Sequence, residues 1–342
     1  MIVASLLLTL LVPGAIAFAP TPITSRATSR AFLNPELAAV PHPSVGDVDA
    51  VTVNRRSVLT SAASALVAAT VSSVSTPFAA FADGDVAGIS TKPTVVVAGA
   101  TGQTGRRILE RLASIPGSSV VAGVRNIDKA TKALSEESTV VRGAMVQKVG
   151  SVNAAGVDFR HLDVEKDSDD TLTTALAGAD ALVIALGFVP GNPLKMTASA
   201  HAVDNVGTCR LIDAAKNAGV RKVVMVSSIL TNGRAWGQEK SPGFVITNAF
   251  GNVLDEKIVA EKYLRASGLD YTIVRPGGLK AKPPAGALAI SGEDTLNSGE
   301  ISRDLVADVC VASISDPKAS NKVLEIIEDE GVPPKVFNGL NM

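Results

Sequence analysis

The chain has 342 residues, of which 46% are hydrophobic and 4% aromatic, with 32 basic and 33 acidic side chains. Residues 1–82 contain four of the basic and three of the acidic side chains, so the rest of the chain has a formal charge near −2. This balance gives no electrostatic argument for nucleic acid or an anionic membrane as a partner. The two cysteines, Cys209 and Cys310, are too few for a disulfide framework, so we expect two small core residues and no metal site.

Residues 1–17 form an apolar stretch that ends on small residues at Ala15 and Ala17. A short hydrophobic core followed by a small-x-small site is typical of a cleavable signal peptide rather than a membrane span. Residues 18–54 begin with Phe18-Ala19-Pro20 and continue as a Ser/Thr/Arg-rich segment with few acids. This arrangement resembles the bipartite presequences of algae with secondary plastids. Ordinary secretion, the alternative, leaves the transit-like segment unexplained.

Residues 55–82 open on Arg55-Arg56 and end in Ala80-Phe81-Ala82, a pattern that resembles a twin-arginine signal for the thylakoid. The stretch is long enough to span a bilayer, but Pro77 and many hydroxyl side chains disfavour a retained anchor. The twin-arginine route moves folded proteins, so a cofactor bound in the stroma could cross with the protein. We expect a plastid protein of the thylakoid lumen without a stable membrane span after processing, and a polar linker at 83–92.

The folded part begins with a β-branched apolar run at 94–98, which is typical of a strand buried on both faces of a parallel sheet. A GxxGxxG turn follows at 99–105, and apolar residues then recur at helical spacing. Between a strand and a helix, such glycines permit a tight turn and let main-chain N–H groups approach a pyrophosphate. A turn made for packing alone is the alternative. The predicted cofactor contacts in this turn are Gly99, Thr101, Gly102, Gln103, Thr104 and Gly105.

The second strand, expected at 119–124, ends at Arg125, twenty residues after Gly105. Sites that prefer NAD place an Asp or Glu near this position, where it accepts hydrogen bonds from the ribose hydroxyls. A carboxylate would repel a 2′-phosphate, whereas a guanidinium can bind it through two hydrogen bonds. Arg125 therefore predicts NADP(H) rather than NAD(H), with a solvated loop charge as the alternative.

Further strands alternate with helical segments, one of which is expected at 203–218. The strands are expected at 157–162, 181–186, 222–226 and 271–274. Asp163-Val164 follows the first of these strands, where the carboxylate could accept a hydrogen bond from an adenine amino group. The alternation predicts a single α/β domain over 93–330, with a doubly wound parallel sheet of the Rossmann type and the ligand at the carboxyl ends of its strands. Residues 331–342 form a C-terminal tail.

With these residues assembled, the chain resembles an atypical short-chain dehydrogenase/reductase, close to the plastid NAD(P)-binding branch. The resemblance covers about residues 93–330 and rests on five segments: GATGQTG at 99–105, VR at 124–125, LDV at 162–164, VVMVSS at 223–228 and GNVLDEKIVAEKYLRASGLDYTIVRPGGL at 251–279. It implies that Arg125 marks NADP preference and that Asp163 meets adenine. It also implies that Lys257 binds the nicotinamide ribose and that Pro276 flanks the nicotinamide.

The chain departs from this family at the proton donor. Catalytic members use Tyr-x-x-x-Lys, because one helical turn places the ammonium beside the phenol. Here Val253 lies four residues before Lys257, and the two tyrosines are Tyr263 and Tyr271, neither of which can form that pair. Ser228 lies near the family's substrate-orienting hydroxyl, but a serine at a strand end is also an ordinary turn residue. Lys257 and Ser228 are therefore the catalytic candidates.

Two Gly/Pro-containing loops, at 188–199 and 231–252, are expected to cover the nicotinamide end. The second loop contains three side chains that could bind an anionic or planar ligand or contact a protein: Arg234, Trp236 and Lys240. His201 could donate a proton near the mouth, although a helix-surface position is the more common role of such a residue. Asp255 and Glu256, beside Lys257, are expected to be solvated.

The sequence is consistent with two functions. One is an NADP(H)-dependent oxidoreductase that acts on a small plastid metabolite with a carbonyl group or a conjugated double bond. The other is a protein that binds NADP(H) without catalysis and engages photosynthetic assemblies through its surface. The near-complete cofactor site favours the first function, and the missing tyrosine and the unusual targeting sequence favour the second. The fold alone does not choose between them, because it hosts both classes.

Overall fold

The computed structural model describes residues 93–136, 138–142, 145–149, 151–152 and 156–341. The expected signal peptide, transit-like segment, twin-arginine signal and linker at 1–17, 18–54, 55–82 and 83–92 lie outside the described residues, so they stay predictions. Among the described residues, none of the helices combines the length and the apolar character needed to cross a bilayer.

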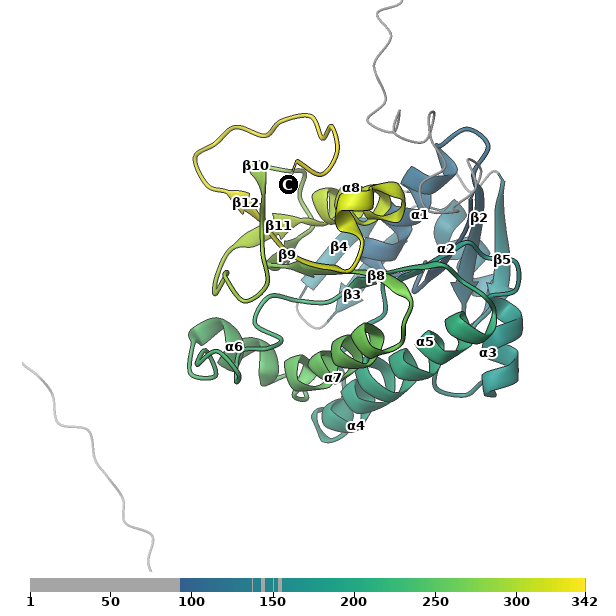
Figure 1. Ribbon diagram of the computed structural model, residues 1–342, viewed down its shortest axis with the longest axis horizontal. Helices are drawn as coiled ribbons and strands as arrows, with labels where there is room; N and C mark the ends of the chain where they lie inside the picture. The colour runs from purple at the N-terminus through teal and green to yellow at the C-terminus, as the bar shows by residue number, and fades with distance from the viewer. Residues whose placement is uncertain (1–92, 137, 143–144, 150, 153–155, 342) are drawn as a thin grey trace, which may run out of the picture. The chain divides into compact units, whose positions relative to one another are not determined.

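An eight-stranded sheet forms the centre of the described part, in the order β10-β12-β8-β7-β6-β1-β2-β5 (Figure 1). Its neighbours pair in parallel, except that β10 is antiparallel to β12. The bounds of the strands are β1 (Thr94–Ala98), β2 (Ser119–Val124), β5 (Val157–His161), β6 (Ala181–Ile184), β7 (Lys222–Val226), β8 (Asp270–Pro276), β10 (Ala287–Ser291) and β12 (Lys322–Asp329). The chain order reverses between β1 and β6, which is where ligands bind in open α/β sheets.

Helices cover both faces of this sheet (Figure 1). One face packs against α1 (Gln103–Ala113), α2 (Ile127–Ser135) and α8 (Arg303–Ser315), and the other against α3 (Asp169–Ala175), α5 (Thr208–Asn217) and α7 (Val253–Ala266). Successive side chains of a strand point to opposite faces, so Val95 belongs to the first apolar core and Val96 to the second. The predicted fold class, a single doubly wound α/β domain, is confirmed.

Several predicted boundaries are wrong. β5 and β6 end before Leu162 and Ala185, because the chain turns there into the site described below. β8 begins one residue early, because β7 pairs with Asp270, and it extends to Pro276, because β12 pairs with it there. The helix expected at 203–218 is a composite of α4 (Met196–Ala200), a π-helical turn (His201–Gly207) and α5. These differences arise from tertiary contacts that the local pattern does not contain.

The expected loops contain short helices, and further strands occur where no element was predicted. The helices are a 3₁₀ turn (Pro193–Lys195) and α6 (Pro242–Asn248) in the two expected loops, and a second 3₁₀ turn (Pro317–Ala319). The additional strands are the antiparallel pair β3 (Ser138–Arg142) and β4 (Met145–Val149) and the parallel pair β9 (Gly278–Lys280) and β11 (Glu300–Ser302). In the tail, Leu340 is buried against the core.

Both cysteines are free in this structure, and of the two only Cys310 is the fully buried core residue that the sequence predicts. Cys310 is buried in α8, whereas Cys209 is half-buried on α5. Burial raises the pKa of the Cys209 thiol to about 11. No group of three or more His, Cys, Asp or Glu side chains within the described segments could bind a metal ion.

Candidate cofactor site

A cleft with a cavity volume of about 330 Å³ opens at the carboxyl ends of β1, β2, β5 and β6. Each of these strand ends contributes to the lining, and the residues after β6 form one wall. Ser199 of α4 and Val203 of the π-helical turn form part of another wall of the cleft. Five of the predicted cofactor-binding residues line this cleft: Gly99, Thr101, Gly102, Arg125 and Val164.

The glycine-rich turn at the base of the cleft depends on close backbone approach. Gly99 has a φ of +83°, and a Cβ atom there would lie 2.5 Å from the carbonyl oxygen of Ala185. A Cβ atom on Gly105 would lie 2.1 Å from the carbonyl oxygen of Gly99. Both positions therefore require glycine, Gly99 for the turn and Gly105 for packing α1 against it.

The amino end of α1 is open to an anion. Gly102 caps the helix without a side-chain hydrogen bond, and the first turn contains no acidic residue. Uncapped N–H groups and the positive end of the helix dipole favour a phosphate. The residues present, including Thr104 in the first turn, thus fit the pyrophosphate of a dinucleotide.

At the adenosine end, Arg125 is available to a ligand. Its side chain is 70% exposed, and its Nη1 atom lies 3.9 Å from Oε2 of Glu165. An exposed ion pair at this distance is weak, so the guanidinium can turn toward a phosphate. Asp163 is buried, and its Oδ1 atom accepts a hydrogen bond from the Glu165 N–H at 3.1 Å. Asp163 therefore shapes this turn, and its contact with adenine stays a prediction.

At the other end of the cleft, Lys257 of α7 approaches the wall formed after β6. Its Nζ atom lies 2.8 Å from Oδ1 of Asp204 and 3.5 Å from the carbonyl oxygen of Leu186, which lines the cleft. The Oδ2 atom of Asp204 accepts a hydrogen bond from the Phe188 N–H at 3.0 Å. Neither Lys257 nor Asp204 lines the described cleft, so the contact of Lys257 with a nicotinamide ribose stays a prediction.

Sequence analysis missed Asp204, although the sequence contains a signal for it. Asp204 lies four residues before Thr208 and seven before Leu211, both of which are buried on the sheet-facing side of the helix. This spacing places Asp204 on the same apolar face. A carboxylate on a buried face needs a cation or several donors, so the position calls for a partner such as Lys257.

The two tyrosines lie away from Lys257. The Tyr263 hydroxyl donates to the carboxylate of Asp213 on α5, and Tyr271 lies near the start of β8, at the amino end of the strand. Hydrogen bonding to Asp213 raises the pKa of Tyr263. Val253, at the position of the family's tyrosine, packs against a small apolar cluster with Leu254.

Ser228 lies just after β7, and Pro276 is the last residue of β8. Ser228 is half-buried, and its carbonyl oxygen accepts a hydrogen bond from Thr231 Oγ1 at 3.2 Å. Pro276 is buried, and its carbonyl oxygen accepts a hydrogen bond from the Ile229 N–H at 3.0 Å. Neither residue lines the described cleft, so their predicted roles stay predictions.

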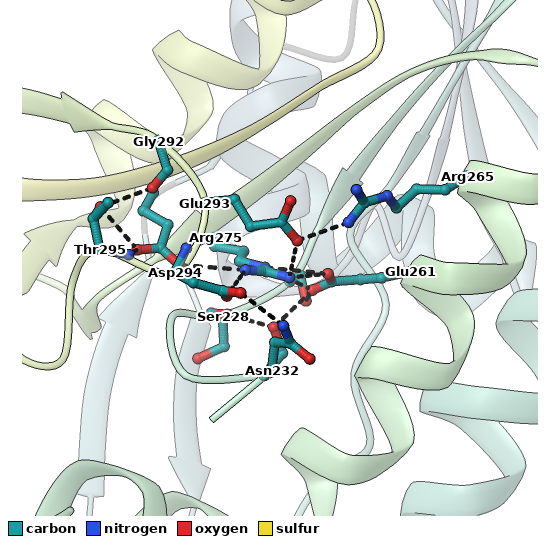
Figure 2. A network of polar contacts seen from close by, with 12 residues as sticks. Ser228, Asn232, Glu261, Arg265, Arg275, Gly292, Glu293, Asp294 and Thr295 are labelled. Carbon is teal, nitrogen blue, oxygen red and sulfur yellow. Dashed lines mark hydrogen bonds and ion pairs between the residues drawn. The ribbon is translucent and has the colours of Figure 1, made fainter. Parts of the chain in front are cut away.

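A polar network lies beside Ser228 and centres on the fully buried Arg275 (Figure 2). The guanidinium contacts Glu261 at 2.6 Å, Asp294 at 2.8 Å, Glu293 at 3.2 Å and Glu325 at 3.3 Å. Burial alone would lower the pKa of Arg275, but hydrogen bonding to Glu261 and the negative charges of Glu261, Asp294 and Glu293 together outweigh it and raise the pKa. The network connects α7, β8 and β12 with the segment after β10.

The expectation that Asp255 and Glu256 are solvated is wrong. Asp255 accepts two hydrogen bonds from Arg234, at 2.6 and 2.8 Å, and a third from the Asn248 amide. Glu256 accepts from the Asn205 amide at 2.7 Å and lies 3.0 Å from Nδ1 of His201. These partners come from α6, its preceding loop and the π-helical turn, all of which pack near α7.

The same contacts change the interpretation of the neighbouring loop residues. Arg234 is already paired and lies over the Phe244 ring, 5.2 Å from its centroid. Trp236 is half-buried and packs against an apolar cluster that includes Phe244 and Leu254. The His201 side chain is 56% exposed and pairs with Glu256 of α7, and it does not line the described cleft.

Comparisons with known proteins identify the family to which the chain belongs. Residues 145–317 match the model of a family described as NAD(P)H-binding. An uncharacterized chloroplastic protein of Arabidopsis thaliana is 41% identical over 246 residues, which cover 72% of this chain and 80% of the relative. The chain belongs to the NAD(P)H-binding family. The protein TIC 62 of Pisum sativum, also chloroplastic, is 33% identical over 252 residues, which cover 70% of this chain and 43% of that protein.

Solved structures agree with this family. ChuY, an anaerobilin reductase from Escherichia coli O157:H7, superposes with a TM-score of 0.52 at 25% identity and covers 70% of this chain and 99% of its own. The resemblance to atypical short-chain dehydrogenases/reductases is thereby confirmed, and so is an NAD(P)H-binding domain of an oxidoreductase-like family. The chloroplastic relatives support a plastid destination.

Proposed function

We propose that the protein is an NADP(H)-dependent reductase of the plastid that acts on a small molecule with a carbonyl group or a conjugated double bond. One observation supports this most directly: a single cleft has the glycine-rich turn at its base and Arg125 in its lining, and the Lys257 ammonium approaches the carbonyl oxygen of Leu186, which lines the wall after β6. The reductase name of the structural neighbour ChuY agrees with this class of reaction. The thylakoid lumen is the proposed destination, because of the twin-arginine pattern at 55–82.

In this proposal the residues of the chain bind and orient the cofactor. The amino end of α1 binds the pyrophosphate, Arg125 binds the 2′-phosphate, and Lys257 binds the nicotinamide ribose as a point charge with three donors. When bound, NADPH supplies a hydride. Ser228 orients the substrate, while Phe188 and Val189 exclude water from the cleft wall.

A second function is an NADP(H)-binding regulatory or assembly factor for photosynthetic complexes that has no catalytic activity. The observation that favours it is Val253 at the tyrosine position, together with the engagement of Tyr263 by Asp213. Such a protein would keep the cofactor site and engage a photosynthetic protein partner through its surface.

The two functions differ in the oxidation of NADPH. We would follow NADPH oxidation against quinones, aldehydes and enones with the natural protein and with Val253→Tyr, which places a phenol one turn from Lys257. Val259→Tyr is the matched control, because Val259 lies on an exposed part of the same helix. We expect turnover by the natural protein, an increase with Val253→Tyr and no change with Val259→Tyr. Silence from all three proteins with NADPH demonstrably bound would contradict the reductase and favour the binding protein.

A further inference from the structure

The π-helical turn at His201–Gly207 is the irregular part of the helix that borders the cleft. Turns of this kind insert one extra residue and occur frequently at functional sites. Gly207, at the end of the turn, packs tightly against the wall after β5: a Cβ atom there would lie 2.7 Å from Cγ2 of Val164, which lines the cleft. The turn therefore brings the helix backbone close to the cofactor cleft.

Asp204 is the buried charged residue of this turn. Its side chain is fully buried. Each carboxylate oxygen has its own partner, Oδ1 the ammonium of Lys257 at 2.8 Å and Oδ2 the N–H of Phe188 at 3.0 Å. Lys257 comes from α7 and Phe188 from the cleft wall after β6, so one carboxylate connects α7 with the wall of the cleft.

Stability alone does not account for this arrangement. Removing two charges from water is costly, and apolar residues of similar size often replace a buried ion pair without loss of stability. The Lys257 side chain is 13% exposed, and its ammonium has three donors and approaches the carbonyl oxygen of Leu186 in the cleft wall, so it can also donate to a ligand.

We propose that Asp204 is a positioning residue that fixes the Lys257 ammonium and the Phe188 backbone around the nicotinamide ribose. This inference rests on the proposed function, since it takes the cleft to bind NADP(H). It adds a residue outside the family's Tyr-x-x-x-Lys pair and gives the π-helical turn a role.

The test compares two ligands that share only the adenosine end: NADPH and adenosine 2′,5′-bisphosphate. In Asp204→Asn the ammonium loses its charged acceptor, so we expect the affinity for NADPH to fall about 10- to 100-fold. The bisphosphate reaches Arg125 but not Lys257, so its affinity should change by less than about twofold. Asp213→Asn is the matched control, because Asp213 lies on α5 and bonds to the exposed Tyr263, and it should alter neither affinity.

A double-mutant cycle keeps the test independent of folding. Asp204→Asn with Lys257→Met removes both buried charges, so it should fold even if Asp204→Asn alone does not. Its affinity for NADPH should match that of Lys257→Met, because Asp204 acts through Lys257. Unchanged NADPH affinity in Asp204→Asn, or equal losses for both ligands, would overturn the positioning role. If the natural protein binds neither ligand, the proposed function fails as well, and this outcome is distinct from the other two.

Discussion

The buried Arg275 network makes a prediction about stability that can be measured without knowledge of the substrate. Replacing Arg275 by Met keeps a long, flexible side chain but removes the cation in Figure 2. Glu261 and Glu325, both fully buried, then lose their counter-ion. Neither carboxylate loses all of its donors, because Glu261 keeps the hydroxyls of Ser227 and Thr231.

The size of the effect follows from these contacts. Removing one partner of a buried ion pair costs about 3–5 kcal/mol, because an uncompensated charge stays inside the protein. Glu325 retains backbone N–H donors from Asp294, Thr295 and Leu296, which favours the lower half of that range. Arg265→Met is the matched control. Its side chain is 40% exposed and pairs with Glu293, so its loss should cost about 0–1 kcal/mol.

The assay is urea unfolding of the cofactor-free protein, with Arg275→Met, Arg265→Met and the natural protein measured together. We expect a much lower urea midpoint for Arg275→Met and nearly equal midpoints for the other two proteins. Adding Glu261→Gln to Arg275→Met should recover part of the loss, since it removes one of the orphaned charges. Equal midpoints for the two arginine variants would show that the network does not stabilise this end of the sheet.

Three further predictions concern a carboxylate, the mature N-terminus and a thiol. Burial alone would raise the pKa of Glu328, but two backbone N–H groups and the Lys280 ammonium outweigh it and lower the pKa. The stability that Glu328 adds over Glu328→Gln should therefore be full at neutral pH and shrink as the pH falls below about 4.3, and a constant difference in urea midpoints would contradict this. N-terminal sequencing of plastid-purified protein should start at or near Asp83, whereas a start between residues 18 and 55 would argue against the lumen. Because burial raises the pKa of Cys209 to about 11, its alkylation in the native protein should be slow at pH 7 and accelerate as the pH rises toward 11, and fast alkylation at neutral pH would be inconsistent with that environment.

The features of the fold that depend on local sequence could be predicted. The valine run of β1 and the glycines at 99, 102 and 105 identify a strand, a turn and a helix in the right order, because each signal lies within a few residues. The same holds for Arg125 at the end of β2, since its position is counted from the turn. Alternation of strands and helices then restricts the topology to a few possibilities.

The features that depend on distant partners could not be predicted. Glu256 is paired because the π-helical turn brings the Asn205 amide within hydrogen-bond distance of it. The spacing of residues in the sequence does not predict that turn. Arg275 occurs in a motif of the family, yet its carboxylate partners lie 14 to 50 residues away along the chain. Asp204 could be predicted in part, because helical spacing indicates that it is buried but does not indicate its partner Lys257.

We infer that this cleft binds NADP(H) through Arg125. The most direct test is a titration of the natural protein with NADPH and with NADH. Arg125→Asp and Lys216→Asp would be titrated alongside. The second makes the same charge change near the exposed carboxyl end of α5, which precedes the amino end of β7 and so lies away from the cleft. We predict that NADPH binds at least about tenfold more tightly than NADH, because a bidentate charged contact to the 2′-phosphate is worth at least about 1.5 kcal/mol. Arg125→Asp should abolish this preference and Lys216→Asp should leave it intact. Equal affinities of the natural protein for NADPH and NADH would contradict the account.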